Sequence, residues 1–229
     1  MNWDFWAGKK VLVTGATGFK GAWLVEVLNY LGAKTLGLGL SEVSDPSLFT
    51  LLNHKGRFET IFRDICREKP LLSVAEQFQP EIVMHLAAES LVLRSFEKPV
   101  QTFFVNVIGT VNVLQDLRSL NSVRSFVHIS SDKTYAPQPF PGQSFTENSE
   151  LGGLDPYSSS KSCADLAFRS MVTSFSLFKR MGLASVRAGN VIGGGDWSRD
   201  RLIPDYMRAL ESGNTLKIRH PNHVRPWQH

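Results

Sequence analysis

Cysteine is scarce in this chain of 229 residues, which contains only two, Cys66 and Cys163. Neither has a CxxC partner or a histidine at metal-ligand spacing, so the sequence predicts no metal site. Two thiols do not build a disulfide framework, and this favours a reducing compartment. No apolar run reaches the ~18 residues that a membrane span requires, and residues 1–10 lack the apolar core of a signal peptide. We therefore expect a cytoplasmic protein with no membrane partner.

Neither sign of charge is in large excess. The 25 Lys and Arg residues against 21 Asp and Glu residues leave a formal net charge of +4, and the basic residues are scattered. Without a basic run to follow a phosphate backbone, nucleic acid is not an expected partner. Hydrophobic residues make up 42% of the chain, which is enough for a packed core.

Short apolar runs alternate with longer amphipathic segments through most of the chain. The predicted strands are 10–14, 33–40, 59–64, 81–86, 125–130 and 183–191. The predicted helices are 21–31, 47–52, 71–78, 99–120 and 157–181. This alternation predicts an α/β fold, a doubly wound parallel (Rossmann) sheet with helices on both faces, over residues 1–191.

Beyond the last predicted strand the pattern changes. Three consecutive glycines, Gly193 to Gly195, precede a predicted short helix at 203–210 and a predicted short strand at 216–219. We interpret residues 192–229 as the start of a smaller C-terminal substrate domain. These elements are too few to bury a core, so we expect the domain to be incomplete at His229. A chain of this extent should bind a dinucleotide more readily than its substrate.

The first predicted strand runs into a GxxGxxG loop at 14–21 (TGATGFKG). Its glycines allow a tight turn and a close approach to a pyrophosphate, and the following helix N-terminus supplies free N–H groups. Strand, loop and helix together predict a dinucleotide site. The second strand ends without the usual acid for the ribose hydroxyls, where only Ser41 or Glu42 could serve, and without an arginine for a 2′-phosphate. The loop therefore favours NAD over NADP.

Two further strand ends should face this cofactor. Asp64 follows the third predicted strand and is placed to meet the adenine edge. Leu86, Ala87 and Ala88 end the fourth strand, and the small residues let a flat cofactor pass close to the backbone.

Tyr157 and Lys161 are spaced i, i+4 at the start of a predicted helix, so they share one face. An ammonium beside a phenol stabilises the phenolate, so we expect a lowered pKa for Tyr157 and a role as base. The fifth strand ends in Ser130, Ser131, Asp132 and Lys133, at the edge of the sheet where substrates bind. Hydride transfer needs only a hydroxyl with the Tyr/Lys pair. The added acid and amine indicate chemistry beyond it.

Several stretches carry a family resemblance. They are TGATGFKG at 14–21, LAAESLV at 86–92, SSDKTY at 130–135, LGGLDPYSSSK at 151–161, RAGNVIGGGDW at 187–197, DRLIPD at 200–205 and RPWQH at 225–229. In these the chain resembles the extended short-chain dehydrogenase/reductase family along essentially its whole length. Within that family it is most similar to the nucleotide-sugar 4,6-dehydratases that act on CDP-glucose. The resemblance implies NAD as cofactor and a nucleotide sugar, CDP-glucose first, as substrate.

The resemblance also implies a mechanism. Tyr157, assisted by Lys161, takes the proton of the C4 hydroxyl while NAD⁺ accepts the C4 hydride. Ser131 hydrogen-bonds the new ketone. Lys133 removes the acidified C5 proton, Asp132 protonates the departing C6 hydroxyl, and the hydride returns to C6. The implied product is CDP-4-keto-6-deoxyglucose, made for polysaccharide biosynthesis.

The resemblance also implies which residues contact the cofactor and the substrate. The expected cofactor contacts are Gly15, Thr17, Gly18, Phe19, Lys20, Gly21, Asp64, Ile65, Leu86, Ala87, Ala88 and Asn106, together with Tyr157 and Lys161. The expected substrate contacts are Ser90, Asn190 and Arg201.

The sequence also predicts an assembly, and it leaves two other interpretations of function open. The helix at 157–181 has more apolar surface than one sheet face requires, so we expect a homodimer in which it pairs with the helix at 99–120. An epimerase or reductase acting on a related nucleotide sugar is a second interpretation, against which Asp132 and Lys133 argue. A third is a catalytically silent NAD-binding module that acts through association.

Overall fold

The structure is a computed structural model that describes residues 3–41, 46–53, 59–137, 144–219 and 221–229. Six parallel strands form its main sheet in the order β3-β2-β1-β4-β5-β6. The strands are β1 (Lys10–Thr14), β2 (Lys34–Gly39), β3 (Thr60–Phe62), β4 (Ile82–His85), β5 (Ser125–Ile129) and β6 (Gly182–Val186). The order reverses between β1 and β4, and at such a switch point the loops diverge and leave room for a ligand. The predicted doubly wound parallel sheet is confirmed.

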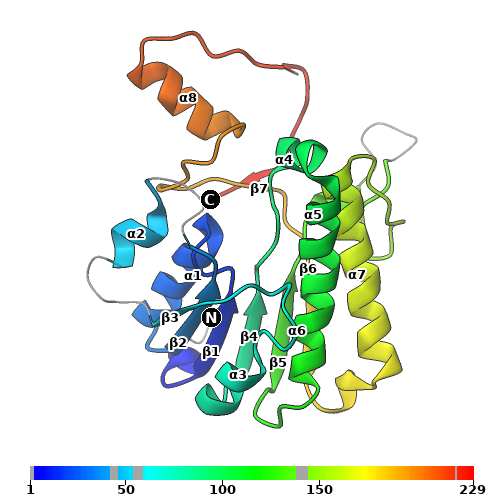
Figure 1. Cartoon of the computed structure of the whole chain (residues 1–229). Helices are drawn as coiled ribbons and strands as arrows, with labels where there is room; N and C mark the ends of the chain where they lie inside the picture. Colours follow the sequence, from blue (N-terminus) through cyan, green and yellow to red (C-terminus); the bar gives the residue numbers. More distant parts are fainter. Residues whose placement is uncertain (1–2, 42–45, 54–58, 138–143, 220) are drawn as a thin grey trace.

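The main sheet has helices on both faces (Figure 1), and alternate residues of β1 belong to two different apolar clusters. The α-helices are α1 (Phe19–Tyr30), α2 (Leu48–Asn53), α3 (Leu72–Phe78), α4 (Val92–Glu97), α5 (Pro99–Phe103), α6 (Gly109–Leu117), α7 (Pro156–Ser174) and α8 (Leu202–Glu211). Val11 and Val13 pack in a cluster with α1 and α2, and Leu12 packs in a cluster with α3, α6 and α7. This is the period of two of a strand that is buried on both faces.

The long helix predicted at 99–120 is interrupted in its middle. After α5 the chain makes a π-helical turn at Phe104–Ile108, called η2, and continues as α6, which ends at Leu117. A π turn accommodates one more residue than an α turn and is common at functional sites. Asn106 lies within this turn and is buried, with its amide bonded to other elements. The sequence period does not predict the turn or the short helix α4.

Two strand predictions at the C-terminal end are wrong. The strand predicted at 183–191 ends at Val186, and Asn190–Val191 forms a separate strand, β7. β7 pairs in parallel with β8 (Trp227–Gln228), close to the end of the chain. Residues 216–219 form no strand, because a strand needs a neighbour to satisfy its backbone and β7 pairs with β8 instead. The helix predicted at 157–181 is also too long, since α7 ends at Ser174.

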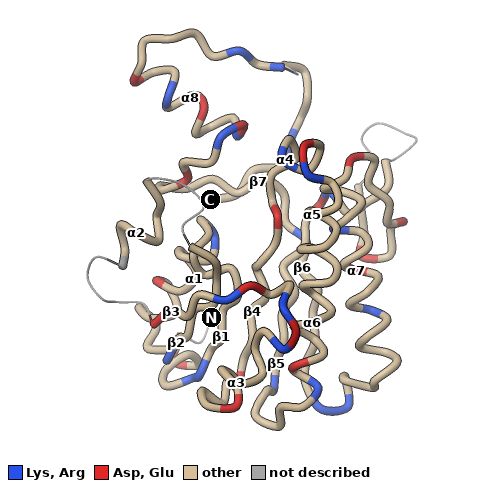
Figure 2. The backbone as a smooth tube through the Cα atoms, in the orientation of Figure 1, with Lys and Arg blue, Asp and Glu red and all other residues tan. Residues whose placement is uncertain are grey.

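The helix α8 lies apart from the main sheet (Figure 1). Its apolar side chains are largely exposed: Leu202, Ile203, Tyr206, Met207 and Leu210. Charges of both signs are spread over the chain, α8 included, without a long stretch of one sign (Figure 2). Within the described residues, no helix is both long and apolar enough to cross a membrane.

Candidate active site

The phosphate loop is a tight turn pressed between two strand ends. Gly15 has φ +72°, and a Cβ there would lie 2.7 Å from the backbone nitrogen of Ala87. A Cβ on Gly21 would lie 2.0 Å from the carbonyl oxygen of Gly15. The hydroxyl of Thr14 accepts a hydrogen bond from the N–H of Ala87 at 3.2 Å, which ties the loop to the end of β4. Only glycine therefore fits at these two positions of the cradle that the loop forms, and such a tight glycine turn is typical of a pyrophosphate-binding loop.

The side of the loop nearest β2 is packed rather than open. A Cβ on Gly39 would lie 2.6 Å from the hydroxyl oxygen of Thr17, whose side chain is buried. Thr17 therefore fixes the loop on β2 and leaves its backbone to face a ligand. Of the two candidates for the ribose acid, Ser41 is exposed after the end of β2, and Glu42 lies outside the described residues.

The turn after β3 uses its polar groups internally. Oδ1 of Asp64 accepts a hydrogen bond from the N–H of Cys66 at 2.9 Å. Burial, with a further contribution from Asp64, raises the pKa of the Cys66 thiol to about 12, so this thiol stays protonated. The side chain of Ile65 is buried against Gly109, where an added Cβ would come within 2.5 Å of it. Asp64 and Ile65 thus shape the turn beside the predicted adenine position.

Lys161 is buried on α7 and donates a hydrogen bond from Nζ to the carbonyl oxygen of Ile129 at 3.0 Å. The pKa of Lys161 is lowered to about 8. Burial is the main cause, Asp165 opposes the shift, and Lys20 adds to it. At pH 7 the ammonium is therefore still the main form. It anchors α7 to the carboxyl end of β5.

The prediction of a lowered pKa for Tyr157 is wrong for this structure. Burial raises the pKa of the phenol above its usual value. A hydrogen bond with Ser131 and the positive charge of Arg201 lower it, but they do not outweigh the burial. The physical reason is that desolvation disfavours the phenolate while the ammonium of Lys161 is engaged with Ile129.

The predicted acid and amine lie on a single turn at the end of β5. This turn, η3 (Asp132–Thr134), is capped by Ser131, whose Oγ accepts from the N–H of Lys133 at 3.2 Å. Oγ of Ser131 also donates to Oδ1 of Asp132 at 3.2 Å, and the N–H of Asp132 donates to the carbonyl of Ala188 at 3.0 Å. The turn therefore brings Ser131 and Asp132 to the same edge as Tyr157, since both affect its pKa.

Arg201 reaches this edge from far along the chain. Its guanidinium donates from Nη1 to Oδ2 of Asp196 at 2.9 Å and from Nη2 to Oγ of Ser90 at 3.2 Å. Its charge lowers the pKa of Tyr157, and it adds to the effect of burial in lowering that of Lys20. Two predicted substrate residues, Ser90 and Arg201, are thus in contact with each other at the site.

The other predicted residues have different surroundings. Asn106 donates from Nδ2 to Oγ of Ser160 at 2.8 Å and accepts from the N–H of Glu89 at 2.8 Å. It is therefore placed to hold the loop after β4 against α7. Asn190 is a strand residue of β7, with its N–H bonded to the carbonyl of Pro226 at 3.0 Å.

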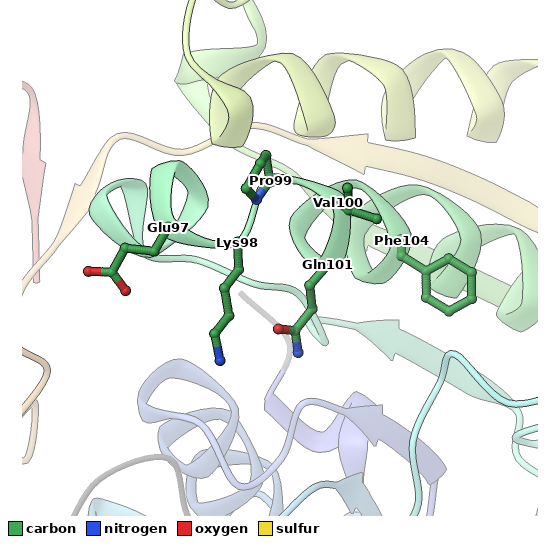
Figure 3. A pocket seen from close by; sticks show the side chains of 6 residues that line it. All are labelled: Glu97, Lys98, Pro99, Val100, Gln101 and Phe104. Atoms are coloured by element: carbon green, nitrogen blue, oxygen red, sulfur yellow. The ribbon is translucent and has the colours of Figure 1, made fainter.

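Two hollows were found near these elements. The larger, about 530 Å³, is a wide and shallow one at the junction of α4 and α5 (Figure 3). It is lined by Glu97, Lys98, Pro99, Val100, Gln101 and Phe104. None of these is a predicted catalytic residue, so this hollow is not the candidate active site. The smaller, about 10 Å³, lies between the phosphate loop and residues 195–198 and is the one that adjoins the predicted cofactor site.

Comparisons with known proteins identify the family of this chain. A family model described as "NAD dependent epimerase/dehydratase family" matches residues 11–229. The chain belongs to this family. CDP-glucose 4,6-dehydratase of Salmonella typhimurium is 44% identical over 231 aligned positions, which cover 99% of this chain and 64% of that protein. For dTDP-glucose 4,6-dehydratase of the same organism the identity is 31%, and the match covers 73% of this chain and 52% of that protein.

A solved structure of a relative has the same fold as this chain. The crystal structure of DesIV, a dTDP-glucose 4,6-dehydratase from Streptomyces venezuelae solved with NAD bound, has a TM-score of 0.81 at 26% identity. The match covers 95% of this chain and 67% of that one. The chain thus spans between about half and two thirds of these relatives. The predicted family resemblance is confirmed, and so is NAD, which the family description names as its cofactor.

Sequence reasoning overlooked Asp165 and Arg187. Arg187 donates from Nε to Oδ2 of Asp165 at 2.8 Å, and the carboxylate is 1% exposed. The one available signal was the spacing of Asp165, four residues after Lys161 on the same helix.

Proposed function

We propose that this chain carries the NAD-binding and catalytic part of a nucleotide-sugar 4,6-dehydratase that acts on CDP-glucose. The observation that carries the proposal is the η3 turn, which sets Ser131 and Asp132 beside Tyr157 and also bears Lys133. The 44% identity to CDP-glucose 4,6-dehydratase over nearly the whole chain supports the same reaction and the same nucleotide.

The residues present fit NAD. The glycines of the phosphate loop keep side chains off its backbone, as contact with a diphosphate requires, and the N-terminus of α1 follows the loop directly. The small residues Ala87 and Ala88 continue β4 along the expected path of the nicotinamide. When bound, NAD⁺ would accept the C4 hydride of the sugar and later return it to C6.

The side chains then divide the proton transfers between them. The ammonium of Lys161 stabilises the phenolate of Tyr157, and this phenolate takes the C4 hydroxyl proton. Ser131 donates a hydrogen bond to the 4-keto oxygen, which acidifies C5–H. Lys133 takes the C5 proton and Asp132 gives a proton to the leaving C6 hydroxyl, so water departs. Lys133 can return its proton to C5 as hydride reaches C6, which regenerates Lys133. Tyr157 then holds one proton more and Asp132 one proton fewer than at the start, so transfer of one proton from Tyr157 to Asp132 closes the cycle.

Three further features belong to the proposal. Residues 192–229 are proposed as part of a second, substrate-binding unit, because α8 exposes an apolar face and Arg201 already reaches the site. The protein is proposed to act in the cytoplasm. A homodimer is proposed through α5, η2 and α7, where Val100, Phe104 and Leu166 are exposed. Figure 3 shows Lys98 and Gln101 pointing to one side of this surface.

The test of the function is incubation with CDP-glucose and a catalytic amount of NAD⁺, run on this chain and on a chain extended to the length of its relatives. We expect 4-keto product from the longer protein without net NADH, and a preference for CDP-glucose over dTDP-glucose. Accumulation of NADH in step with product would contradict the dehydratase and support a simple dehydrogenase. Epimerised sugar without loss of water would support the epimerase. Light scattering on the longer protein tests the dimer.

A further inference from the structure

Asp165 is a buried carboxylate to which the proposed mechanism gives no role. Its Oδ2 accepts from Nε of Arg187 at 2.8 Å, and its Oδ1 accepts from Oγ of Ser185 at 2.9 Å. Nε2 of His128 lies 3.4 Å from the same Oδ1. These partners belong to β5, to β6 and to the residue just after β6. One carboxylate therefore ties α7 to the carboxyl ends of two neighbouring strands, one helical turn from Lys161.

Asp165 is ionised in these surroundings. Burial raises its pKa, but the nearby His128 and the hydrogen bonds from Arg187 and Ser185 outweigh burial and hold the pKa well below its usual range. Burial lowers the pKa of His128, so the imidazole is neutral at pH 7. Arg187 is thus the charged partner of Asp165. The negative charge is fixed in place by groups that do not titrate near neutral pH.

The titratable groups that interact with Lys161 come from β4 (His85), β5 (His128), α1 (Lys20) and α7 (Asp165). Burial lowers the pKa of both histidines, so they are neutral at pH 7 and Lys20 is the positively charged member of this group. Asp165 is the carboxylate among them that favours the ammonium form. Without it, burial and Lys20 would act on Lys161 unopposed.

We propose that Asp165 is a positioning residue for the Tyr157–Lys161 pair, because it ties the turn of α7 that carries Lys161 to β6 and the residue after it and holds a buried carboxylate one helical turn from Lys161. The inference deepens the proposed function, since it depends on Lys161 being charged when Tyr157 takes its proton. It concerns a residue that touches neither substrate nor cofactor.

The same carboxylate connects to the turn that carries Asp132. Nη1 of Arg187 donates to the hydroxyl of Tyr135 at 3.2 Å, and the guanidinium lies 4.9 Å from the centre of the Tyr135 ring. Tyr135 is the C-cap residue directly after η3. Asp165 therefore supports, through Arg187, the second group of proposed catalytic residues as well as the first.

The test measures the protonation of Lys161 without any turnover. Urea unfolding is followed from pH 6 to pH 10.5 with and without Lys161→Met, in the parent chain and in the Asp165→Asn, Asp165→Glu and Ser185→Ala backgrounds. The pH at which the effect of Lys161→Met begins to change reports the folded-state pKa of Lys161. Ser185→Ala is the matched control, because it removes one hydrogen bond to Asp165 and keeps the charge.

We expect this pH to fall by about one unit with Asp165→Asn, as the loss of one nearby opposite charge predicts. Ser185→Ala and Asp165→Glu should leave it near the parent value. An unchanged pH in Asp165→Asn, with lower stability at every pH, would overturn the proposal and leave Asp165 as a structural tie. If Asp165→Asn does not fold, the double variant Asp165→Asn/Arg187→Gln is compared with Arg187→Gln alone, so that the difference between these two reports the charge of Asp165.

Activity supplies an independent check. In a dehydratase-active protein, Asp165→Asn should move the alkaline limb of the pH–kcat profile to lower pH by a similar amount, and Ser185→Ala should not. If the dehydratase proposal fails, the parent protein makes no 4-keto product. The unfolding measurement needs no substrate, so it tests the role of Asp165 in either case. The two failures are therefore distinguishable.

Discussion

The phosphate loop gives the sharpest quantitative prediction, the effect of Gly21→Ala. A Cβ at this position would lie 2.0 Å from the carbonyl oxygen of Gly15, 2.7 Å from its carbonyl carbon and 2.8 Å from Cα of Ala16. Ordinary contact begins at 3.4 Å, so the oxygen would have to move by about 1.4 Å. All three atoms are backbone, and Gly15 is itself pressed against Ala87, so no side chain can rotate away.

The size of the effect follows from the cost of overpacking. Such a clash costs roughly 1–3 kcal/mol in the free energy of unfolding. For a domain of this size each kcal/mol lowers Tm by about 2–4 °C, so Tm should fall by about 2–12 °C. If the same free energy is lost from cofactor binding, the Kd for NAD⁺ rises roughly 5- to 150-fold. We expect binding to suffer at least as much as stability, because the displaced atoms form the cradle itself.

Calorimetric titration with NAD⁺ and thermal unfolding check both numbers. Gly182→Ala is the matched control, because its nearest neighbour, the carbonyl oxygen of Arg124, is 3.8 Å from an added Cβ and its φ is not positive. The control should bind NAD⁺ as the parent does. Gly21→Ala with the parent's Tm and NAD⁺ affinity would refute the reasoning, because it would mean that the loop yields freely. Loss of Tm with unchanged affinity would place NAD away from this loop.

Three further predictions concern the catalytic groups. The pKa of Lys161 falls from 10.5 to about 8 on folding, so the unfolded chain binds more protons between these values and stability rises with pH across that window. Lys161→Met should remove this rise, which amounts to up to about 3 kcal/mol, and equal pH slopes in urea unfolding would contradict it. Tyr157→Phe should slow transfer of deuterium from C4-labelled CDP-glucose by roughly 10²–10⁴-fold, with a normal rate as the contrary result. Asp132→Asn should leave that first transfer nearly intact but slow water loss by a similar factor, and wild-type product formation would remove Asp132 from its role.

Much of the site was readable because its motifs are local. The glycine spacing of the loop at 14–21 predicts a tight turn without knowledge of the rest of the fold. Tyr157 and Lys161 are four residues apart, so they lie on one face of any helix that contains both. The direction of the pKa shift of Tyr157 was not readable in this way. It depends on burial and on Arg201, a residue 44 positions further along the chain, and burial is a property of the folded molecule. The role of Asp165 is hidden for the same reason, since its partners lie on β5 and β6.

The amino-acid sequence by itself determined the alternation of strands and helices, the parallel sheet and the position of the nucleotide loop. These follow from side-chain period and from the conformations that glycine permits, which act over a few residues. Tertiary structure alone decided that residues 216–219 form no strand and that β7 pairs with β8, because a strand is completed by its neighbour. It also decided the π turn that holds Asn106 and the charge states around Lys161. Hydrogen-bond partners, burial and the distances between charges all arise from segments that the chain brings together only on folding.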